Sequence, residues 1–232
     1  MSHTTPDQLR DAARETMREL EGQELKPKAR LAIPQQDMPS QDPLERRGNM
    51  NEVTYGYFEE QAWVEAQRCL QCKNAPCIKG CPVAIDIPRF IQKIVDKDYD
   101  GSLGVIKETS LLPSICGRVC PQEAQCQLFC TVGKSKKDVF QSVSIGRLER
   151  FVADHGAGKS DAPAVKPDTG KNVAVIGSGP AGITAAADLR REGHSVTIFE
   201  AFHKPGGVMI YGIPEFRLPK RIVQDELATL EQ

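Results

Sequence analysis

The spacing of apolar residues predicts a mainly helical N-terminal region. Between residues 8 and 21, apolar side chains recur every three or four positions, and Asp7 is placed to cap the start of this helix. Further amphipathic helices are predicted at 57–70, 88–98, 101–110 and 142–154. The polar stretch between the first two helices contains four prolines and predicts an extended arm over a surface.

The period of the pattern changes after residue 171. Asn172–Ile176 and Ser195–Phe199 are short apolar runs typical of strands, and Pro180–Glu192 between them has the pattern of a helix. This order predicts a βαβ unit, followed by a last helix at 219–230. The preceding stretch, DHGAGKSDAPAVKPDTGK, is rich in Gly, Ala, Pro and charge and is typical of a linker.

Composition and charge exclude several classes of function. The 232 residues carry a net charge of −1, so no strong basic or acidic balance indicates a nucleic acid or a membrane surface as partner. The N-terminus is polar and lacks the apolar core of a secretory signal, and no apolar run is long enough to span a bilayer. The predicted location is cytoplasmic.

All eight cysteines lie between residues 69 and 130, in two groups. The first has the spacing Cys-x2-Cys-x4-Cys-x3-Cys and consists of Cys69, Cys72, Cys77 and Cys81, with a proline directly after it. The second has the spacing Cys-x3-Cys-x5-Cys-x3-Cys and consists of Cys116, Cys120, Cys126 and Cys130. Disulfides are disfavoured in a reducing compartment, so clustered cysteines there indicate metal ligands or redox groups.

Two metal sites compete for this pattern, besides the simpler alternative of buried, inert thiols. Structural zinc favours two Cys-x2-Cys pairs separated by a longer gap, and only one such pair is present. Short cysteine runs with a remote fourth ligand are typical of iron–sulfur clusters, and in two-cluster ferredoxins the last cysteine of a run serves the other cluster. The spacing therefore favours two iron–sulfur clusters and an electron-transfer function.

A glycine motif follows the first predicted strand. Gly177, Gly179 and Gly182 form a Gly-x-Gly-x-x-Gly fingerprint that opens the next helix, the context in which this motif binds a dinucleotide. The helix N-terminus would supply amide donors to phosphates. Glu200 ends the second strand and is placed to accept hydrogen bonds from ribose hydroxyls, and its charge disfavours a 2′-phosphate there. The fingerprint alone fits FAD and NAD, and a purely structural glycine turn is the remaining alternative.

The stretch from Arg68 to Cys77 and the Gly80-Cys81-Pro82 that follows resemble the N-terminal domain of the glutamate synthase small subunit. The segments PQQDMPSQDPLERRGNMNEV, SICGRVCPQEAQCQLFC and SIGRLERF share this resemblance, which extends over nearly the whole chain after residue 34. The same domain type is found in the large subunit of NADH-dependent ferredoxin:NADP oxidoreductase and in dihydropyrimidine dehydrogenase.

The resemblance implies an interleaved set of ligands for two [4Fe–4S] clusters. One cluster would be held by Cys69, Cys72, Cys77 and Cys130. The other would be held by Cys81, Cys120, Cys126 and Glu149. Cys116 is then the spare cysteine, either buried beside the second cluster or binding in place of Glu149, whose simpler interpretation is a solvated helix carboxylate.

The resemblance also favours FAD over NAD. The Pro180-Ala181 pair within the fingerprint, after Ser178, and the later Gly206-Gly207 pair resemble flavoproteins of the same family. In that family NAD(P)H reduces FAD, and single electrons leave through the clusters. No convincing further parallel strand follows Glu200, so we expect an N-terminal fragment that binds clusters but holds FAD weakly by itself.

The predicted fold is thus mainly α: a helical two-cluster domain at 1–155 that includes the arm, a linker at 156–170, and an incomplete α/β Rossmann-type FAD-binding segment at 171–232. The leading functional prediction is the N-terminal portion of an NAD(P)H-dependent oxidoreductase, the glutamate synthase small subunit, working with a catalytic large subunit. The alternatives are a subunit of a ferredoxin:NADP transhydrogenase or sulfide dehydrogenase with another electron-accepting subunit, a non-enzymatic electron-transfer module, and a zinc-stabilised interaction domain.

A small basic run, Lys134, Lys136 and Lys137, stands apart from these motifs. Such a run is usually a solvated face. The alternative is electrostatic steering of an acidic electron donor such as a ferredoxin.

Overall fold

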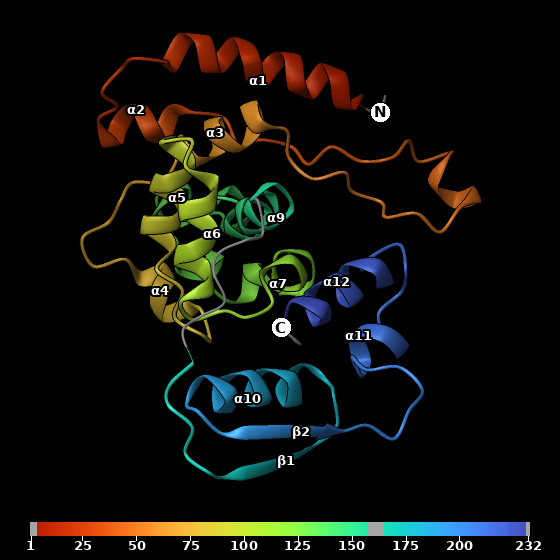
Figure 1. Cartoon of the computed structure of the whole chain (residues 1–232). Helices are drawn as coiled ribbons and strands as arrows, with labels where there is room; N and C mark the ends of the chain where they lie inside the picture. Colours follow the sequence, from red (N-terminus) through yellow and green to blue (C-terminus); the bar gives the residue numbers. More distant parts are fainter. Residues whose placement is uncertain (1–3, 157–164, 231–232) are drawn as a thin grey trace. The chain divides into compact units, whose positions relative to one another are not determined.

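The computed structural model describes residues 4–156 and 165–230 (Figure 1). The chain divides into two compact units, Met1–Gly158 and Lys159–Gln232. Residues 157–164 of the predicted linker lie outside the described residues. None of the described helices is both long and apolar enough to cross a membrane.

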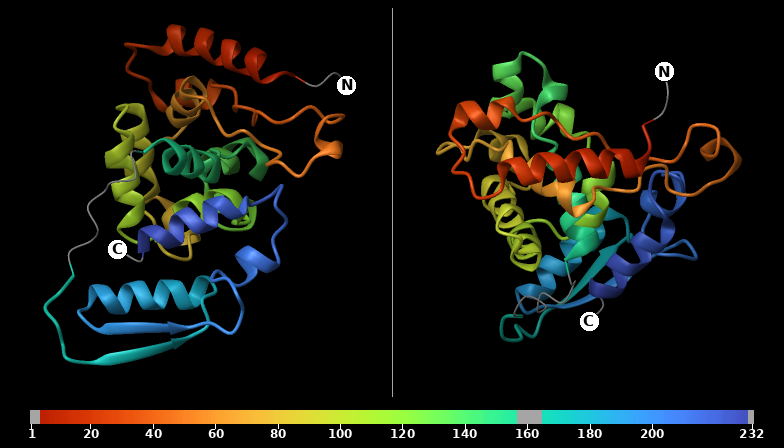
Figure 2. Two further views of the ribbon diagram at one scale, coloured as in Figure 1. Left: turned by 45° about the vertical axis from the view of Figure 1, so that its right-hand side comes forward. Right: turned by 90° about the horizontal axis from the view of Figure 1, so that it is seen from above.

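Helices joined by short loops make up the N-terminal unit (Figures 1 and 2). Its α-helices are α1 (Pro6–Leu20), α2 (Pro27–Ala32), α3 (Glu59–Gln67), α4 (Pro76–Gly80), α5 (Ile87–Val95), α6 (Tyr99–Lys107), α7 (Pro113–Val119), α8 (Thr131–Lys136) and α9 (Ile145–His155). Short 3-10 helices are η1 (Arg46–Gly48), η2 (Gln122–Ala124), η3 (Gln127–Phe129) and η4 (Val139–Gln141). The predicted long helices are confirmed to within a few residues at their ends.

The cap of α1 differs from the prediction. Thr5, not Asp7, caps the helix, because the Thr5 hydroxyl accepts from the Gln8 amide at 3.3 Å and the Gln8 side chain accepts from the Thr5 amide at 2.9 Å. This reciprocal capping box satisfies two amides that the first turn leaves without helical partners. Pro6, which has no amide hydrogen, then occupies the first helical position.

The core of the N-terminal unit is built around α5. Asp86 caps this helix, and Ile87, Phe90, Ile91 and Ile94 recur at helical spacing, each at most 2% exposed. They belong to one apolar cluster with buried residues of α3, α6 and α9. The cluster also contains three cysteines, so the candidate ligands lie at the edge of the same core.

The proline-rich arm is more ordered than an extended segment over a surface. It contains α2 and then returns on itself through an antiparallel bridge between Ser40 and Thr54. Two backbone hydrogen bonds flank the bridge, from the Gln41 amide to the Val53 oxygen at 2.9 Å and from the Tyr55 amide to the Pro39 oxygen at 2.8 Å. Figure 1 shows the resulting orange loop, which extends away from the helices and carries η1 at its tip.

In the C-terminal unit, two parallel strands pair along their length, with β1 (Asn172–Ile176) in register with β2 (Ser195–Phe199). The helix α10 (Pro180–Arg191) joins them and packs on both strands, and α11 (Val208–Tyr211) and α12 (Lys220–Leu230) follow. Ile176 and Phe199 at the strand ends are 82% and 55% exposed. The predicted order of helical domain and partial βαβ segment is confirmed.

Candidate functional site

Four thiols line one cavity in the N-terminal unit. They are those of Cys69, Cys72, Cys77 and Cys130, the set that the resemblance implied for one cluster. The cavity encloses about 350 Å³ of empty space, part of it open to solvent. Its other walls are formed by the side chains Leu70, Pro76, Ile87, Pro88, Ile91, Thr131, Val132, Val143 and Ile145. Four thiols on a nearly apolar cavity suit a metal–sulfur group whose positive charge compensates the thiolates.

Two of the thiols in this cavity, those of Cys69 and Cys77, resist ionisation. Burial, together with the charges of the neighbouring thiols, raises the pKa of Cys69 to about 11 and that of Cys77 to about 12. Buried negative charges are costly unless a cation compensates them. Iron binding would therefore be coupled to the release of protons from these thiols.

A second group forms where α7, α9 and η3 meet. Burial, followed by the nearby charges of Glu149 and Cys81, raises the pKa of Cys126 to about 12. Cys120 belongs to the same neighbourhood: a hydrogen bond with Cys116 lowers its pKa overall, and the nearby charges of Glu149, Cys126 and Cys81 oppose this shift. The structure therefore brings together the four residues predicted for the second cluster.

Cys116 lies beside this group. A hydrogen bond with Cys116 lowers the pKa of Cys120, and the charge of Cys116 also acts on Glu149. Both cysteines belong to α7, one turn apart, with Cys120 at its C-terminal cap. The spare cysteine of the prediction is thus in contact with a candidate ligand, and both alternatives for the last ligand remain geometrically open.

Glu149 is a buried carboxylate with an unused oxygen. It lies on α9 and is 5% exposed, and its Oε1 has no hydrogen-bond partner among the described residues. Burial, and then the charge of Cys116, holds its pKa well above the usual range. The alternative interpretation of Glu149 as a solvated helix carboxylate does not fit this burial, and a buried polar atom without a partner costs free energy.

The close approach of α7 and α9 depends on Gly117. A Cβ at this position would lie 2.5 Å from the Arg150 nitrogen and 2.7 Å from its Cα, so only glycine fits. The contact places Cys116 and Cys120 of α7 against the Glu149 turn of α9. Sequence reasoning missed Gly117, because nothing in the pattern of α7 indicates which backbone it meets.

Gly80 plays the corresponding part between α4 and η3. A Cβ there would overlap the Phe129 ring and would lie 2.9 Å from the Gln125 oxygen. The contact brings Cys81, at the end of α4, next to Cys126, at the start of η3. Each of these short segments also carries a thiol of the first group, Cys77 in one and Cys130 in the other.

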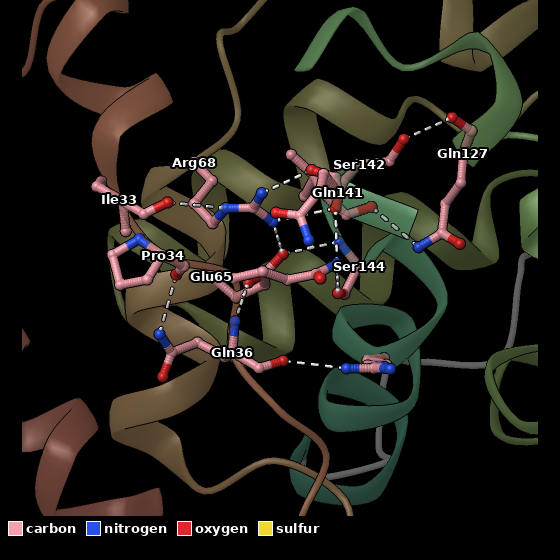
Figure 3. A network of polar contacts seen from close by, with 12 residues as sticks. Ile33, Pro34, Gln36, Glu65, Arg68, Gln127, Gln141, Ser142 and Ser144 are labelled. Atoms are coloured by element: carbon pink, nitrogen blue, oxygen red, sulfur yellow. Dashed lines mark hydrogen bonds and ion pairs between the residues drawn. The ribbon is translucent and has the colours of Figure 1, made fainter. Parts of the chain in front are cut away.

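A buried charge network lies beside the first group (Figure 3). Arg68 directly precedes Cys69, is fully buried, and pairs with Glu65 at 2.5 Å. Its guanidinium also donates to the oxygens of Gln141 and Ser142, at 2.7 and 3.0 Å. Buried guanidinium groups need this many partners because their desolvation is costly. The network therefore ties the first cysteine to the loop that enters α9.

Glu65 extends the network toward Glu149. Its carboxylate accepts from the Ser144 amide at the N-cap of α9 at 2.8 Å and from the Gln36 amide at 2.9 Å. On the other side, the Ser142 hydroxyl donates to the Gln127 oxygen at 2.9 Å. Figure 3 shows these contacts converging from the arm, α3, η3 and the start of α9. Sequence reasoning missed this network, although a Glu and an Arg three residues apart on an apolar helix face were a usable signal.

Arg30 is a further charged residue beside the first group. Its guanidinium donates to the oxygens of Gln67 and Cys69, at 2.9 and 3.1 Å, and its charge favours the thiolate of Cys69. Among the described residues, no group of three or more Cys, His, Asp or Glu side chains is arranged to hold a single metal ion.

The glycine fingerprint of the C-terminal unit has the expected backbone geometry. Gly177 has a φ of +90°, and a Cβ on Gly182 would overlap the Gly177 oxygen. Pro180 and Ala181 form the first turn of α10, so its amide end follows directly on the glycines. Gly207, with a φ of +53°, packs against Gly179, where a Cβ would lie 2.8 Å from the Gly179 Cα.

Glu200 is oriented by the fingerprint itself. Its Oε2 accepts from the Ser178 amide at 3.0 Å and from the Ser178 hydroxyl, and its Oε1 accepts from the Phe202 amide at 2.8 Å. The Ser178 hydroxyl, followed by the two amides, lowers the pKa of Glu200 to about 2. Gly206 also contacts Ser178, because its amide donates to the backbone oxygen of Ser178 at 3.1 Å. The carboxylate is therefore fixed in its ionised form beside the motif.

Comparison with known families assigns both units. Residues 46–160 match the family described as dihydropyrimidine dehydrogenase domain II, 4Fe-4S cluster. Residues 175–217 match the NAD(P)-binding Rossmann-like domain. The chain therefore contains an iron–sulfur domain of the dihydropyrimidine dehydrogenase type and a segment of a Rossmann-like nucleotide-binding domain. The predicted resemblance is confirmed, and with it an iron–sulfur cofactor and a nucleotide-binding segment.

Curated members of the family cover most of this chain. The NAD-dependent dihydropyrimidine dehydrogenase subunit PreT of Escherichia coli K12 is 39% identical over 192 residues, 82% of this chain and 45% of that protein. The NADPH glutamate synthase small chain of Azospirillum brasilense is 35% identical over 201 residues, 84% of this chain and 40% of that protein. The Escherichia coli small chain is 36% identical over 189 residues, 80% of this chain and 39% of that protein. The chain thus spans less than half the length of these relatives.

Proposed function

We propose that this chain forms part of an NAD(P)H-dependent iron–sulfur flavoprotein in which electrons pass between FAD and two [4Fe–4S] clusters. The observation that carries the proposal is the separation of the candidate ligands into two neighbouring groups. One group is the cavity lined by Cys69, Cys72, Cys77 and Cys130. The other contains Cys81, Cys120, Cys126 and Glu149.

The residues present fit these clusters in number and in chemistry. Thiolates are the usual ligands of iron–sulfur clusters, and other donors are known at single positions. The unused Oε1 of Glu149 supports an oxygen ligand in the second group. The carboxylate would change the reduction potential of the second cluster relative to the first, because ligand type and surrounding hydrogen bonds set that potential.

The C-terminal unit supports the flavin part of the proposal. FAD, when bound, takes a hydride from NAD(P)H and returns electrons one at a time. The glycines Gly177 and Gly179 leave room for a pyrophosphate at the start of α10, and Glu200 is ionised and held where a ribose would lie. An oxygen in Glu200 has a second lone pair, so accepting from Ser178 does not prevent it from accepting from a ribose hydroxyl.

The partner of the chain defines which reaction these electrons serve. We propose a glutamate synthase small subunit that works with a catalytic large subunit, supported by relatives of that name at 35–36% identity. The 39% identity to PreT supports a second candidate, a subunit that supplies electrons to a dihydropyrimidine dehydrogenase. Co-purification with a tagged chain from its own cells separates the two, because each candidate requires a different catalytic partner.

Iron and sulfide analysis after anaerobic purification tests the cluster proposal directly. About eight iron and eight sulfide per chain are expected for two four-iron clusters. Zinc without iron would overturn the whole proposal. Addition of NADPH tests the flavin part: bleaching of a bound flavin supports an enzyme, whereas clusters without any flavin response indicate an electron-transfer module.

A further inference from the structure

Two ligand-bearing segments of the N-terminal unit carry only positive charge. Residues 73–82 and 124–137 contain no Asp or Glu, and the exposed carboxylates Glu123 and Asp138 flank the second segment. Their lysines are Lys73, Lys79, Lys134, Lys136 and Lys137, and all five are exposed. The whole chain has a net charge of −1, so this concentration of positive charge is local. Exposed charge of one sign steers the approach of partners of the opposite sign.

The two segments pack directly on each other. Phe129 of η3 lies against Gly80 of α4, and the Lys134 ammonium of α8 lies 5.6 Å from the centre of the Phe129 ring. The short helices η3 and α8 are consecutive along the chain and are also in contact. Lys134 of one segment therefore lies over the Phe129 ring, and Lys79 of the other directly precedes the glycine on which that ring packs.

The centre of this patch is apolar. Leu128 and Phe129 are 49% and 38% exposed, although they lie between the buried thiols of Cys126 and Cys130. In the proposed assignment, Cys126 belongs to one cluster and Cys130 to the other. An exposed apolar centre with a charged rim is the general anatomy of a protein interface. Here it covers ligands of both clusters.

We propose that this patch docks an acidic one-electron carrier protein. The patch, called the lysine surface, consists of Lys79, Leu128, Phe129, Lys134, Lys136 and Lys137. The proposal rests on the proposed function, because it needs clusters beneath the surface. The lysines attract an acidic rim on the carrier, and the apolar centre excludes water where the two redox groups come closest. One electron then moves from the reduced carrier to a cluster or in the reverse direction, and no bond is formed or broken.

Charge reversal on the lysine surface tests this proposal in the cluster-loaded full chain. The probe is a reduced plant-type [2Fe–2S] ferredoxin, an acidic carrier with a low reduction potential. The test variant carries Lys134→Glu, Lys136→Glu and Lys137→Glu. The control variant carries Lys28→Glu, Arg46→Glu and Arg47→Glu, three exposed cations on α2 and η1 that give the same change in net charge. Stopped-flow absorbance measures the second-order rate of cluster reduction at low and high salt.

At low salt, we expect the test variant to react at least tenfold more slowly than the wild type and the control to stay within about twofold. The wild-type rate should fall as salt rises. Equal rates in all three proteins, or equal losses in both variants, would overturn the proposal. The proposal would also be overturned if the wild type bound a random-sequence duplex DNA as tightly as it binds the ferredoxin. Photoreduction with uncharged deazariboflavin reports whether clusters are present. A chain with no iron would contradict the proposed function as well. A loaded, reducible chain whose rate does not depend on these charges would contradict only the proposed docking at the lysine surface.

The apolar centre provides an independent arm of the test. Leu128→Ser should weaken ferredoxin binding severalfold while leaving the salt dependence unchanged, because it removes apolar contact area but no charge. Leu44→Ser is the matched control, since Leu44 is 68% exposed on the arm. Equal affinities of the two variants would show that the apolar centre takes no part in docking and would overturn this arrangement of the surface.

Discussion

A Cβ on Gly117 would lie 2.5 Å from the backbone nitrogen of Arg150. Because the nearest atoms are backbone, no rotamer change relieves this contact. Gly117→Ala should therefore push α7 away from α9, with a loss of about 1–3 kcal/mol in the free energy of unfolding. The shift also moves Cys120 away from Glu149, so we expect the iron content to fall from about eight toward about four per chain. Urea denaturation and iron analysis measure the two effects.

Gly104→Ala is the control for this substitution. Gly104 lies within α6, and a Cβ there meets nothing within 4 Å. The substitution should be neutral or should stabilise the protein by up to about 1 kcal/mol, because alanine favours helix more than glycine does. Similar losses for Gly104→Ala and Gly117→Ala would contradict the importance of the contact between α7 and α9.

Substitutions of Glu149 and Cys116 identify the last ligand of the second cluster. Glu149→Ala should remove that cluster and leave about four iron per chain, whereas Glu149→Cys should retain about eight and lower the reduction potential of one cluster. Cys116→Ser should keep the full iron content. Iron analysis and an EPR-monitored redox titration measure these outcomes. Loss of iron in Cys116→Ser with normal iron in Glu149→Ala would assign the ligand to Cys116.

Removing the buried guanidinium of Arg68 should destabilise the N-terminal unit severely. Arg68→Met leaves Glu65 charged and buried and leaves the oxygens of Gln141 and Ser142 without their donor. We expect a loss of about 3–5 kcal/mol in the free energy of unfolding, the usual effect of breaking a buried ion pair from one side. Arg89→Met is the control, because the ion pair of Arg89 with Glu108 is half exposed and should contribute less than about 1 kcal/mol. A loss below 1 kcal/mol for Arg68→Met would contradict the network as a support of the site.

The ionisation of Glu200 should depend on the Ser178 hydroxyl. The pKa of this carboxyl is about 2 in the folded chain, against an ordinary value of 4.5. A lowered folded pKa means that the stability contributed by Glu200 is complete above pH 4.5 and is lost as the pH falls toward 2. Ser178→Ala should raise the pKa toward 4.5, as measured by the carboxyl carbon chemical shift against pH. Thr169→Ala is the control, because it removes a hydroxyl elsewhere in the same unit and should leave the pKa of Glu200 at about 2. Equal pKa values of Glu200 in both variants would argue against the contact with the Ser178 hydroxyl.

Helices with a regular apolar stripe could be predicted from sequence, and α5 shows why. Ile87, Phe90, Ile91 and Ile94 repeat at helical spacing, so the periodicity alone defines the buried face. The short helix α7 was not predicted, because it has seven residues, begins at a proline, and has no sustained apolar repeat. Its conformation depends on contacts with α9, which lies about thirty residues later in the chain.

The candidate site shows the same division. The clustering of the cysteines indicated metal ligands, but spacing alone did not assign Cys77 and Cys81 to different groups; that expectation came from the family resemblance. The burial of Glu149 could not be predicted, since its own helix offers both solvated and buried faces. Only the tertiary contacts of α7 and α9 place this carboxylate among thiols.

The order of the candidate ligands along the chain has a consequence for assembly. Two short segments, Cys77 to Cys81 and Cys126 to Cys130, each contribute one thiol to the first group and one thiol to the second. In the proposed assignment the first site extends from Cys69 to Cys130 and the second from Cys81 to Glu149, so the two spans overlap. A cut at any point between Cys69 and Glu149 therefore severs at least one site. Loading of one cluster draws together both segments that the other needs, and the domain should fill its two sites cooperatively, passing from empty to fully loaded with little half-filled protein in between.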